Sequence, residues 1–334
     1  MFIMSFKVAG FFSGAGGLDL GFKQAGFDIV WANEFDKKVI PTLEYNSPGT
    51  VIDSRSIVDI KPEDIPDVDG FIGGPPCQSW SVGGASRGLE DKRGQVFLTY
   101  INLIKAKQPK FFVIENVSGM LSKTHEEAFQ FLIKELSSLH YNFTYKTVNA
   151  ADYGVPQDRK RVFFVGYHKS IKGDFVFPNK SDKKVTLKDA IWDLRKNVMP
   201  AKKGNKTNGD SCKISNHEYY LDSYSSMYMS RNRVRSWNEQ SFTIQASARQ
   251  APQHPQAPKM VRTGKDTYDF VKASEGLYRR LSVREAARVQ TFPDDFTFIY
   301  SNVADGYKMV GNAVPVALAK QIGEVIFKGL TEAK

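Results

Sequence analysis

Cys77 is the residue whose type and setting most clearly suggest chemistry, because the chain has only two cysteines in 334 residues. It lies in the stretch GGPPCQSWS, residues 73–81, directly after Pro75 and Pro76. Each proline fixes a backbone φ angle, so the turn would hold the thiol rigidly. A free thiol has a pKa of about 8.5 and needs activation before its thiolate can attack. The context favours a nucleophile, with an inert thiol as the alternative; Cys212 lies in a polar, irregular segment and is interpreted as incidental.

Glu115 and Asn116 close the apolar run KFFVIENV, which is typical of a buried parallel strand. They are either a satisfied buried pair or an acid with the side chain that orients it. A carboxyl in such a place can have a raised pKa and donate a proton. Arg159 and Arg161 stand two residues apart before another strand, so an extended chain would place both on one face. We expect them to hold a phosphate or the rim of a base, with a solvated strand entrance as the alternative.

A glycine-rich turn, FFSGAGGLDLGF, supplies Gly14, Gly16 and Gly17 between a predicted strand and helix. A dinucleotide fingerprint would need a glycine at position 19, where Asp19 stands, and an acid there argues against pyrophosphate. Glu34 ends the next strand, the place where a carboxylate takes up ribose hydroxyls. These features predict a nucleoside site rather than a simple turn. S-adenosylmethionine fits it, because this ligand carries a sulfonium and no phosphate.

The elements that must position these residues alternate between strand-like and helix-like segments. Strands are expected at residues 6–11, 29–35, 70–74, 110–117 and 161–167, and helices after residue 14, over 96–109 and over 125–141. This alternation predicts an α/β, doubly wound sheet. Ligands bind outside the carboxyl ends of the strands in such sheets. Gly14, Glu34, Cys77 and Glu115 all fall at that edge.

The alternation breaks near residue 180, which suggests an insertion. Residues 212–262 are rich in Ser, Tyr, Arg, Gln and Pro and have no helical repeat. Helical spacing returns from residue 277, where Ser282 and Glu285 can form a capping box. We therefore expect a catalytic and cofactor-binding domain over 1–185, a smaller irregular recognition domain over 186–299, and a segment over 300–334 that returns to the first domain.

The charge is uneven along the chain, although the net value is +10. Residues 1–150 carry 15 basic and 17 acidic side chains, whereas residues 151–300 carry 27 and 16. A basic half suits a polyanion such as nucleic acid, with a basic surface that has no partner as the alternative. No apolar run approaches the roughly 20 residues that span a bilayer. The two cysteines favour a reducing, cytoplasmic setting, and no His/Cys spacing suggests a metal site.

Six motifs occur in order along the chain: FSGAGG, NEFD, GGPPCQSWS, ENV, QDRKR and GNAVP. Together they resemble the cytosine-5 DNA methyltransferases, from Phe12 to the helix after Pro315. The middle of the chain contains NHEYY, MSRNRVRSWNE, QASARQ and HPQAP. These stretches are similar to the target-recognition region of the HaeIII-type enzymes that modify GGCC. One departure is Ser56, where some relatives have an aspartate near the adenine.

The resemblance implies a Rossmann-like, S-adenosylmethionine-dependent methyltransferase domain with an inserted target-recognition domain. Cys77 would add to C6 of the cytosine, Glu115 would hydrogen-bond or protonate N3, and Arg161 would hold the base or its phosphate with Arg159 nearby. Expected cofactor contacts are Phe12, Gly14, Gly16, Glu34, Ile57, Val96 and Asn312.

A base inside a duplex must be flipped out to be reached. Residues 79–94 suit a mobile lid over it, with a functionless surface loop as the alternative. DNA contacts are expected from Ser81, Arg87, Arg231, Arg233 and Arg249, where arginine can read guanine or contact phosphate only. The expected partner is double-stranded DNA, bound by a monomer that works alongside a cognate restriction endonuclease without touching it. Two alternatives stay open: a tRNA cytosine-5 methyltransferase, and an inactive DNA-binding protein.

Overall fold

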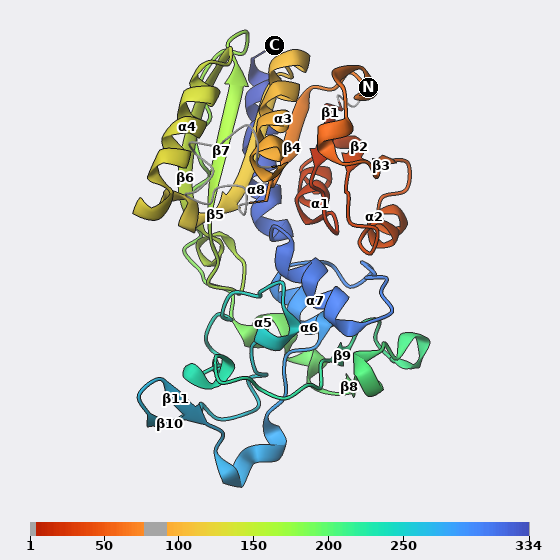
Figure 1. Ribbon diagram of the computed structural model, residues 1–334, viewed down its shortest axis with the longest axis vertical. Helices are drawn as coiled ribbons and strands as arrows, with labels where there is room; N and C mark the ends of the chain where they lie inside the picture. The colour runs from red at the N-terminus through yellow and green to blue at the C-terminus, as the bar shows by residue number, and fades with distance from the viewer. Residues whose placement is uncertain (1–4, 77–91, 334) are drawn as a thin grey trace.

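The computed structural model describes residues 5–76 and 92–333, without the side chains of residues 92–94. Figure 1 shows two lobes, an upper one and a lower one. The upper lobe contains a sheet with helices packed on it. The lower lobe contains short helices and long irregular segments.

A seven-stranded sheet forms the upper lobe, in the order β3-β2-β1-β4-β5-β7-β6. The five strands β3, β2, β1, β4 and β5 run parallel to one another, whereas β7 is antiparallel to both β5 and β6. The expected doubly wound α/β fold is therefore confirmed. The strands are β1 Lys7–Phe11, β2 Asp28–Asn33, β3 Val51–Asp53, β4 Gly70–Gly73, β5 Phe111–Val117, β6 Tyr141–Asn149 and β7 Lys160–His168.

Two edge strands, β3 and β6, were not expected from the sequence. β3 has three residues, and β6 has mostly exposed or half-buried positions. An edge strand packs less of its surface than a central one, so it lacks the continuous apolar run by which buried strands are recognised.

Helices cover both faces of the sheet. Alternate residues of each strand point to opposite faces, so both faces present apolar side chains that the helices bury. Phe111 and Val113 of β5 join a core with α1 and α8, whereas Phe112 and Ile114 join a second core with α3 and α4. The helices of this lobe are α1 Gly17–Gln24, α2 Ile40–Asn46, α3 Lys92–Lys107, α4 Glu126–Ser137 and α8 Val316–Glu332. Among the described helices, none is long and apolar enough to cross a membrane.

In the lower lobe, α6 and α7 pack against the segment around Ile244 and Ala248, and this core extends to Ala15, Val39 and Val316 of the upper lobe. The elements of the lower lobe are α5 Leu187–Ile191, β8 Met199–Pro200, β9 Glu218–Tyr219, β10 Val261–Gly264, β11 Thr267–Asp269, α6 Val283–Val289 and α7 Val303–Asn312. The helix expected from residue 277 begins only at Val283, because Ser282 caps it. The predicted capping box is confirmed: Ser282 Oγ accepts from the Glu285 N–H at 3.0 Å, and Glu285 Oε2 accepts from the Ser282 N–H at 2.8 Å.

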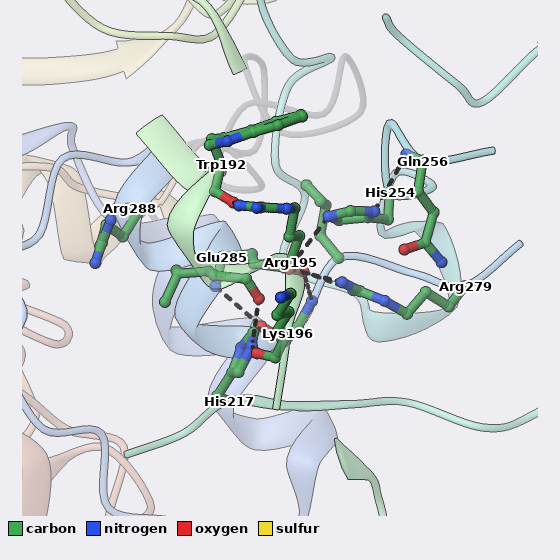
Figure 2. A network of polar contacts seen from close by, with 12 residues as sticks. Trp192, Arg195, Lys196, His217, His254, Gln256, Arg279, Glu285 and Arg288 are labelled. Carbon is green, nitrogen blue, oxygen red and sulfur yellow. Dashed lines mark hydrogen bonds and ion pairs between the residues drawn. The ribbon is translucent and has the colours of Figure 1, made fainter. Parts of the chain in front are cut away.

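A buried polar network holds α6 in this lobe (Figure 2). Arg279 donates to both carboxylate oxygens of Glu285, at 2.7 and 2.8 Å. His254 Nε2 lies 3.4 Å from Glu285 Oε1, and burial lowers the His254 pKa to about 4, so this ring is neutral at pH 7. His217 Nδ1 lies 2.8 Å from Ser282 Oγ. A fully buried carboxylate is thus paired and hydrogen-bonded, as burial of a charge requires.

Candidate active site

The glycine-rich loop connects β1 to α1 with an unusual backbone path. Phe12, Gly14 and Gly16 have φ angles of 53°, 55° and 88°. Glycine adopts such angles readily, whereas a phenylalanine at positive φ is strained and such strain often marks a functional loop. The three residues predicted to contact the cofactor therefore share one tightly shaped turn at the carboxyl end of β1.

Glu34 is tied directly to this turn, as its position after β2 suggested. Its Oε2 accepts from the Gly14 N–H at 2.8 Å, and its Oε1 accepts from the Asp36 N–H at 2.7 Å. Burial raises the Glu34 pKa, and these two hydrogen bonds partly oppose the shift. Each carboxylate oxygen has a further lone pair. The half-buried carboxylate can therefore also accept from ligand hydroxyls.

Three apolar side chains stand near the same end of the sheet. Ile57 is 3% exposed and belongs to the core beneath α3, and Val96 of α3 packs against that core. Phe35, directly after Glu34, is 68% exposed. The sequence analysis did not single out Phe35, although an aromatic residue beside a ribose-binding acid was a signal for a ring that could stack on a base.

Asp19 does not stand where the sequence analysis placed it. The interpretation took it as an acid facing the ligand, but its side chain is buried in the first turn of α1. A Cβ atom on Gly10 would lie only 2.6 Å from Asp19 Oδ1 and 2.8 Å from Ser13 Oγ, so the carboxyl faces β1 beneath the loop. Burial raises the Asp19 pKa to about 7. Asp19 therefore supports the loop from beneath. Because it does not face a ligand, it gives no ground for excluding pyrophosphate.

Glu115 and Arg161 meet across the antiparallel pair β5–β7. Arg161 Nε lies 2.9 Å from Glu115 Oε1, and Val117 pairs with Arg161 in the register. Burial raises the Glu115 pKa, and the charges of Arg161 and Arg159 lower it in part. A buried carboxyl with a raised pKa and a guanidinium beside it is suited to deliver or share a proton.

The turn that leads to Cys77 is anchored beside this pair. Asn116 Nδ2 donates to the Pro75 carbonyl at 2.9 Å, two residues before the cysteine. A Cβ atom on Gly74 would lie 3.1 Å from Glu115 Oε2, so the turn passes close to the acid. Asn116 thus orients the turn rather than the acid. Cys77 itself, with Ser81, Arg87 and the predicted lid up to residue 91, lies outside the described residues.

Arg159 occupies a different environment from Arg161, although both belong to the same strand entrance. It is 1% exposed, and its guanidinium donates to the carbonyls of Ile244, Gly311 and Ala313. Burial lowers its pKa to about 9. This setting does not favour the expected contact between Arg159 and a base or phosphate. Asn312 lies between two of its partners and has an exposed side chain.

The three arginines predicted to read DNA differ in exposure. Arg231 and Arg249 are exposed, whereas Arg233 is 5% exposed and donates through Nε to Tyr228 and through Nη2 to Met227. Arg231, Arg233 and Arg235 stand at alternate positions, yet they do not share one exposed face. Arg235 is half-buried and pairs with Glu239 at 3.2 Å. These hydrogen bonds and ion pairs depend on how the segment folds, which the spacing of the arginines does not reveal.

The chain is similar to known proteins in sequence and in fold. Residues 6–328 match the family described as C-5 cytosine-specific DNA methylase. The chain is 55% identical to the Type II methyltransferase M.MthTI of Methanothermobacter thermautotrophicus over 98% of both chains. It is 54% identical to the Type II methyltransferase M.NgoPII of Neisseria gonorrhoeae over 97% of this chain and 96% of that one.

Two solved structures share the fold over nearly their whole length. An E. coli prophage chain described as a DNA modification methyltransferase has a TM-score of 0.74 and 27% identity, covering 98% of this chain and 99% of that one. The S. pombe Dnmt2 methyltransferase has a TM-score of 0.68 and 19% identity over the same shares. With a family match over almost all residues, the chain belongs to the C-5 cytosine-specific DNA methylases and is a DNA cytosine-5-methyltransferase.

Proposed function

We propose that this enzyme transfers a methyl group from S-adenosylmethionine to C5 of a cytosine within GGCC in duplex DNA. The observation that carries the proposal is the Glu115–Arg161 pair, 2.9 Å apart, beside the turn that Asn116 anchors just before Cys77. Cytosine C5 is a poor nucleophile. The site therefore has to add a group to the ring, manage the charge on N3, and present the ring to a methyl donor.

In the first step the Cys77 thiolate adds to C6 of a flipped cytosine, and a new C–S bond forms. Glu115 in its acid form donates a proton to N3 and so takes up the negative charge that the addition places on the ring. The raised Glu115 pKa supports this role, because the acid form persists to higher pH than for an exposed glutamate. Arg161 orients the carboxyl through its 2.9 Å contact and holds the base or its phosphate.

The second half of the reaction restores the aromatic ring. S-adenosylmethionine, when bound, would supply its sulfonium methyl group to C5 of the activated ring: the C5–CH3 bond would form, the S–CH3 bond would break, and S-adenosylhomocysteine would leave. The C5 proton then leaves to solvent water, the C–S bond breaks, and Cys77 departs as the thiolate. Glu115 takes back the N3 proton at this stage, so it acts first as an acid and then as a base.

The glycine-rich loop and Glu34 fit the methyl donor. Glu34 accepts from the backbone N–H groups of Gly14 and Asp36, and its remaining lone pairs can accept from ribose hydroxyls. Among the described residues there is no arginine or lysine on this loop, as suits a ligand with a cationic sulfonium rather than phosphate. Phe12, Gly16, Ile57, Val96 and Asn312 complete the proposed cofactor contacts.

The lower lobe would read the DNA. Arg231 and Arg249 are exposed and can make bidentate contacts with guanine. Arginine is therefore the side chain best suited to read a site made only of G·C pairs. Arg233 keeps its Nη1 group free of the two contacts that brace it, so it can support a base contact from within the loop. Gln245 and Gln250 are secondary donors. Relatives named Type II methyltransferases support a role beside a restriction endonuclease that cleaves the same site. We further propose a cytoplasmic monomer.

Bisulfite sequencing of a plasmid from cells that express the chain tests this proposal. We expect protected cytosines within GGCC and none elsewhere. Protection at another sequence would overturn the specificity and leave the reaction class intact. A parallel assay with duplex DNA and tRNA as methyl acceptors distinguishes the substrates, and transfer to tRNA alone would overturn the DNA assignment.

A further inference from the structure

Arg159 is a buried cation whose guanidinium donates to backbone carbonyl groups instead of pairing with a carboxylate. It is 1% exposed, and within the described ranges it forms no ion pair. Its Nη1 donates to the Ile244 carbonyl at 2.9 Å, and its Nη2 donates to the Gly311 and Ala313 carbonyls at 2.9 and 3.0 Å. Burying a charge is costly, so an arginine kept in this setting needs a specific role.

The three carbonyls belong to two segments with different expected tasks. Gly311 and Ala313 flank Asn312, the proposed cofactor contact at the end of α7. Ile244 lies on the segment 241–249, which ends at the proposed DNA reader Arg249. These segments touch, since a Cβ atom on Gly311 would lie only 2.2 Å from the backbone carbon of Gln245.

Two buried glutamines, Gln157 and Gln290, also connect the segment 241–249 with the end of α7. Gln157 Oε1 accepts from the Ile244 N–H at 2.7 Å, and Gln157 Nε2 donates to Gln290 Oε1 at 2.7 Å. Gln290 Nε2 donates to the carbonyls of Val310 and Ala313 at 2.8 and 3.0 Å. Both polar groups of the Ile244 backbone are thus bound by side chains from the entrance of β7.

The same strand entrance also carries Arg161, one member of the proposed catalytic pair. Arg161 stands two residues after Arg159 and contacts Glu115 at 2.9 Å across β5 and β7. Because β7 is hydrogen-bonded to a strand on each side, β5 and β6, its entrance is held in place by the sheet. The positions of Asn312 and of the segment 241–249 relative to Glu115 then depend on what the Arg159 guanidinium holds.

We infer that Arg159 is a positioning residue, which sets the cofactor contact Asn312 and the DNA-reading segment 241–249 against the Glu115–Arg161 pair. The inference rests on the proposed function for the roles of Asn312 and Arg249. It replaces the expectation that Arg159 touches the base. A lysine cannot take its place, because one ammonium lacks the planar fork that reaches three carbonyls from fixed directions.

Arg159→Lys tests the inference, and Arg284→Lys is its matched control. Arg284 is also fully buried and donates to three carbonyls, those of Ser215, Pro293 and Phe296, but it touches neither Asn312 nor the segment 241–249. Thermal unfolding, S-adenosylhomocysteine affinity, and the ratio of methylation rates on GGCC and on single-base variants are measured for both.

We expect both variants to unfold at a lower temperature. Only Arg159→Lys should weaken S-adenosylhomocysteine binding, by at least about tenfold (about 1.4 kcal/mol), and reduce the discrimination ratio. If both variants lose affinity and discrimination alike, or neither does, Arg159 has no special positioning role. A loss of turnover with binding and discrimination unchanged would instead restore the direct catalytic contact.

A double-mutant cycle and one further variant make the test independent of how well Arg159→Lys folds. If Arg159 positions Asn312, the loss of S-adenosylhomocysteine affinity caused by Asn312→Ala should shrink in the Arg159→Lys background, whereas additive losses would contradict positioning. Gly311→Ala keeps Arg159 but forces the two segments apart, so it should reproduce the combined loss of affinity and discrimination. A Gly311→Ala protein that is unchanged in both would overturn the inference. Absence of binding and methylation in the unaltered protein would instead indicate failure of the proposed function.

Discussion

Arg161 Nε lies 2.9 Å from Glu115 Oε1, across the antiparallel strands β7 and β5. The contact joins a buried acid with a raised pKa to a guanidinium that is 15% exposed. The Asn116 side chain anchors the turn that leads to Cys77 beside this pair, so Glu115 and the support of the proposed nucleophile lie at one end of β5.

Replacing Glu115 with glutamine should remove proton delivery to N3 while keeping the shape of the side chain. General acid–base catalysis contributes roughly 100- to 10,000-fold, so we expect a loss of turnover of that order. S-adenosylhomocysteine affinity, measured by calorimetry, should stay unchanged. A variant that keeps more than about a tenth of the activity would remove Glu115 from the mechanism.

The Glu115 acid also predicts a limb in the pH profile of the wild-type enzyme. Its raised pKa keeps the acid form present above the range of an ordinary glutamate, and that form is lost as pH rises through the raised value. The single-turnover rate of the wild-type enzyme should therefore fall as pH rises through the Glu115 pKa. The rate of Glu115→Gln should not show this decrease. Parallel profiles for the two proteins would contradict this assignment.

Glu34→Gln should weaken S-adenosylmethionine binding and leave DNA binding intact. The loss of charge-assisted hydrogen bonds to ribose costs about 1.5–3 kcal/mol, or roughly ten- to hundredfold in affinity. Asp36→Asn is the matched control, because this neighbouring carboxylate pairs with Lys308 at 2.7 Å and makes no contact with Gly14. Equal losses in both variants, or an equal loss of DNA affinity, would indicate damage to the loop.

Arg231→Ala and Arg249→Ala should each relax discrimination at one base pair, at a cost of about 1–3 kcal/mol. A phosphate contact would instead weaken binding to every sequence and lower the salt dependence. Methylation rates on GGCC and on each single-base variant, at two salt concentrations, separate these outcomes. Arg55→Ala, an exposed arginine paired with Asp53 at the far edge of the sheet, should leave all rates unchanged.

Asp19→Asn should change how stability depends on pH. The folded-state pKa of Asp19 is about 7, against an ordinary value of 3.8, because burial disfavours the charge. The folded state therefore binds more protons than the unfolded state between these values, and stability falls as pH rises through that window. Asparagine does not titrate, so the melting temperature of Asp19→Asn relative to wild type should rise from pH 4 to 7 and level off above it. The groups that face Asp19 are Ser13, Glu34 and Tyr100, and a difference independent of pH would show that the carboxyl titrates normally.

Features set by local pattern could be predicted from the sequence. The apolar run ending in Glu115, the acid after β2 and the glycines after β1 all follow from how parallel strands end and turn. Their meeting at one sheet edge follows from the alternation of strands and helices. Glu34 confirms this most directly, since it binds the backbone of the glycine-rich loop that lies twenty residues earlier.

Features set by distant partners could not be predicted. Arg159 and Arg161 have the same residue type and lie two positions apart, yet one binds carbonyls 85 to 154 residues away and the other binds Glu115. Asp19 was misplaced because the side of α1 that it occupies is decided by packing against β1. The braces that bury Arg233 likewise come from the folding of its own loop, which has no periodic pattern.

The most direct test of the central claim is covalent capture with 5-fluorocytosine at the target position of a GGCC duplex. Fluorine cannot leave C5 as a cation, so the adduct with the nucleophile should accumulate in the presence of S-adenosylmethionine. We predict a complex that survives denaturing electrophoresis and whose mass-mapped attachment site is Cys77; Cys77→Ser should abolish it, and Cys212→Ser should keep it. A complex that persists in Cys77→Ser, or no complex from wild-type protein that methylates ordinary GGCC, would contradict the proposed mechanism.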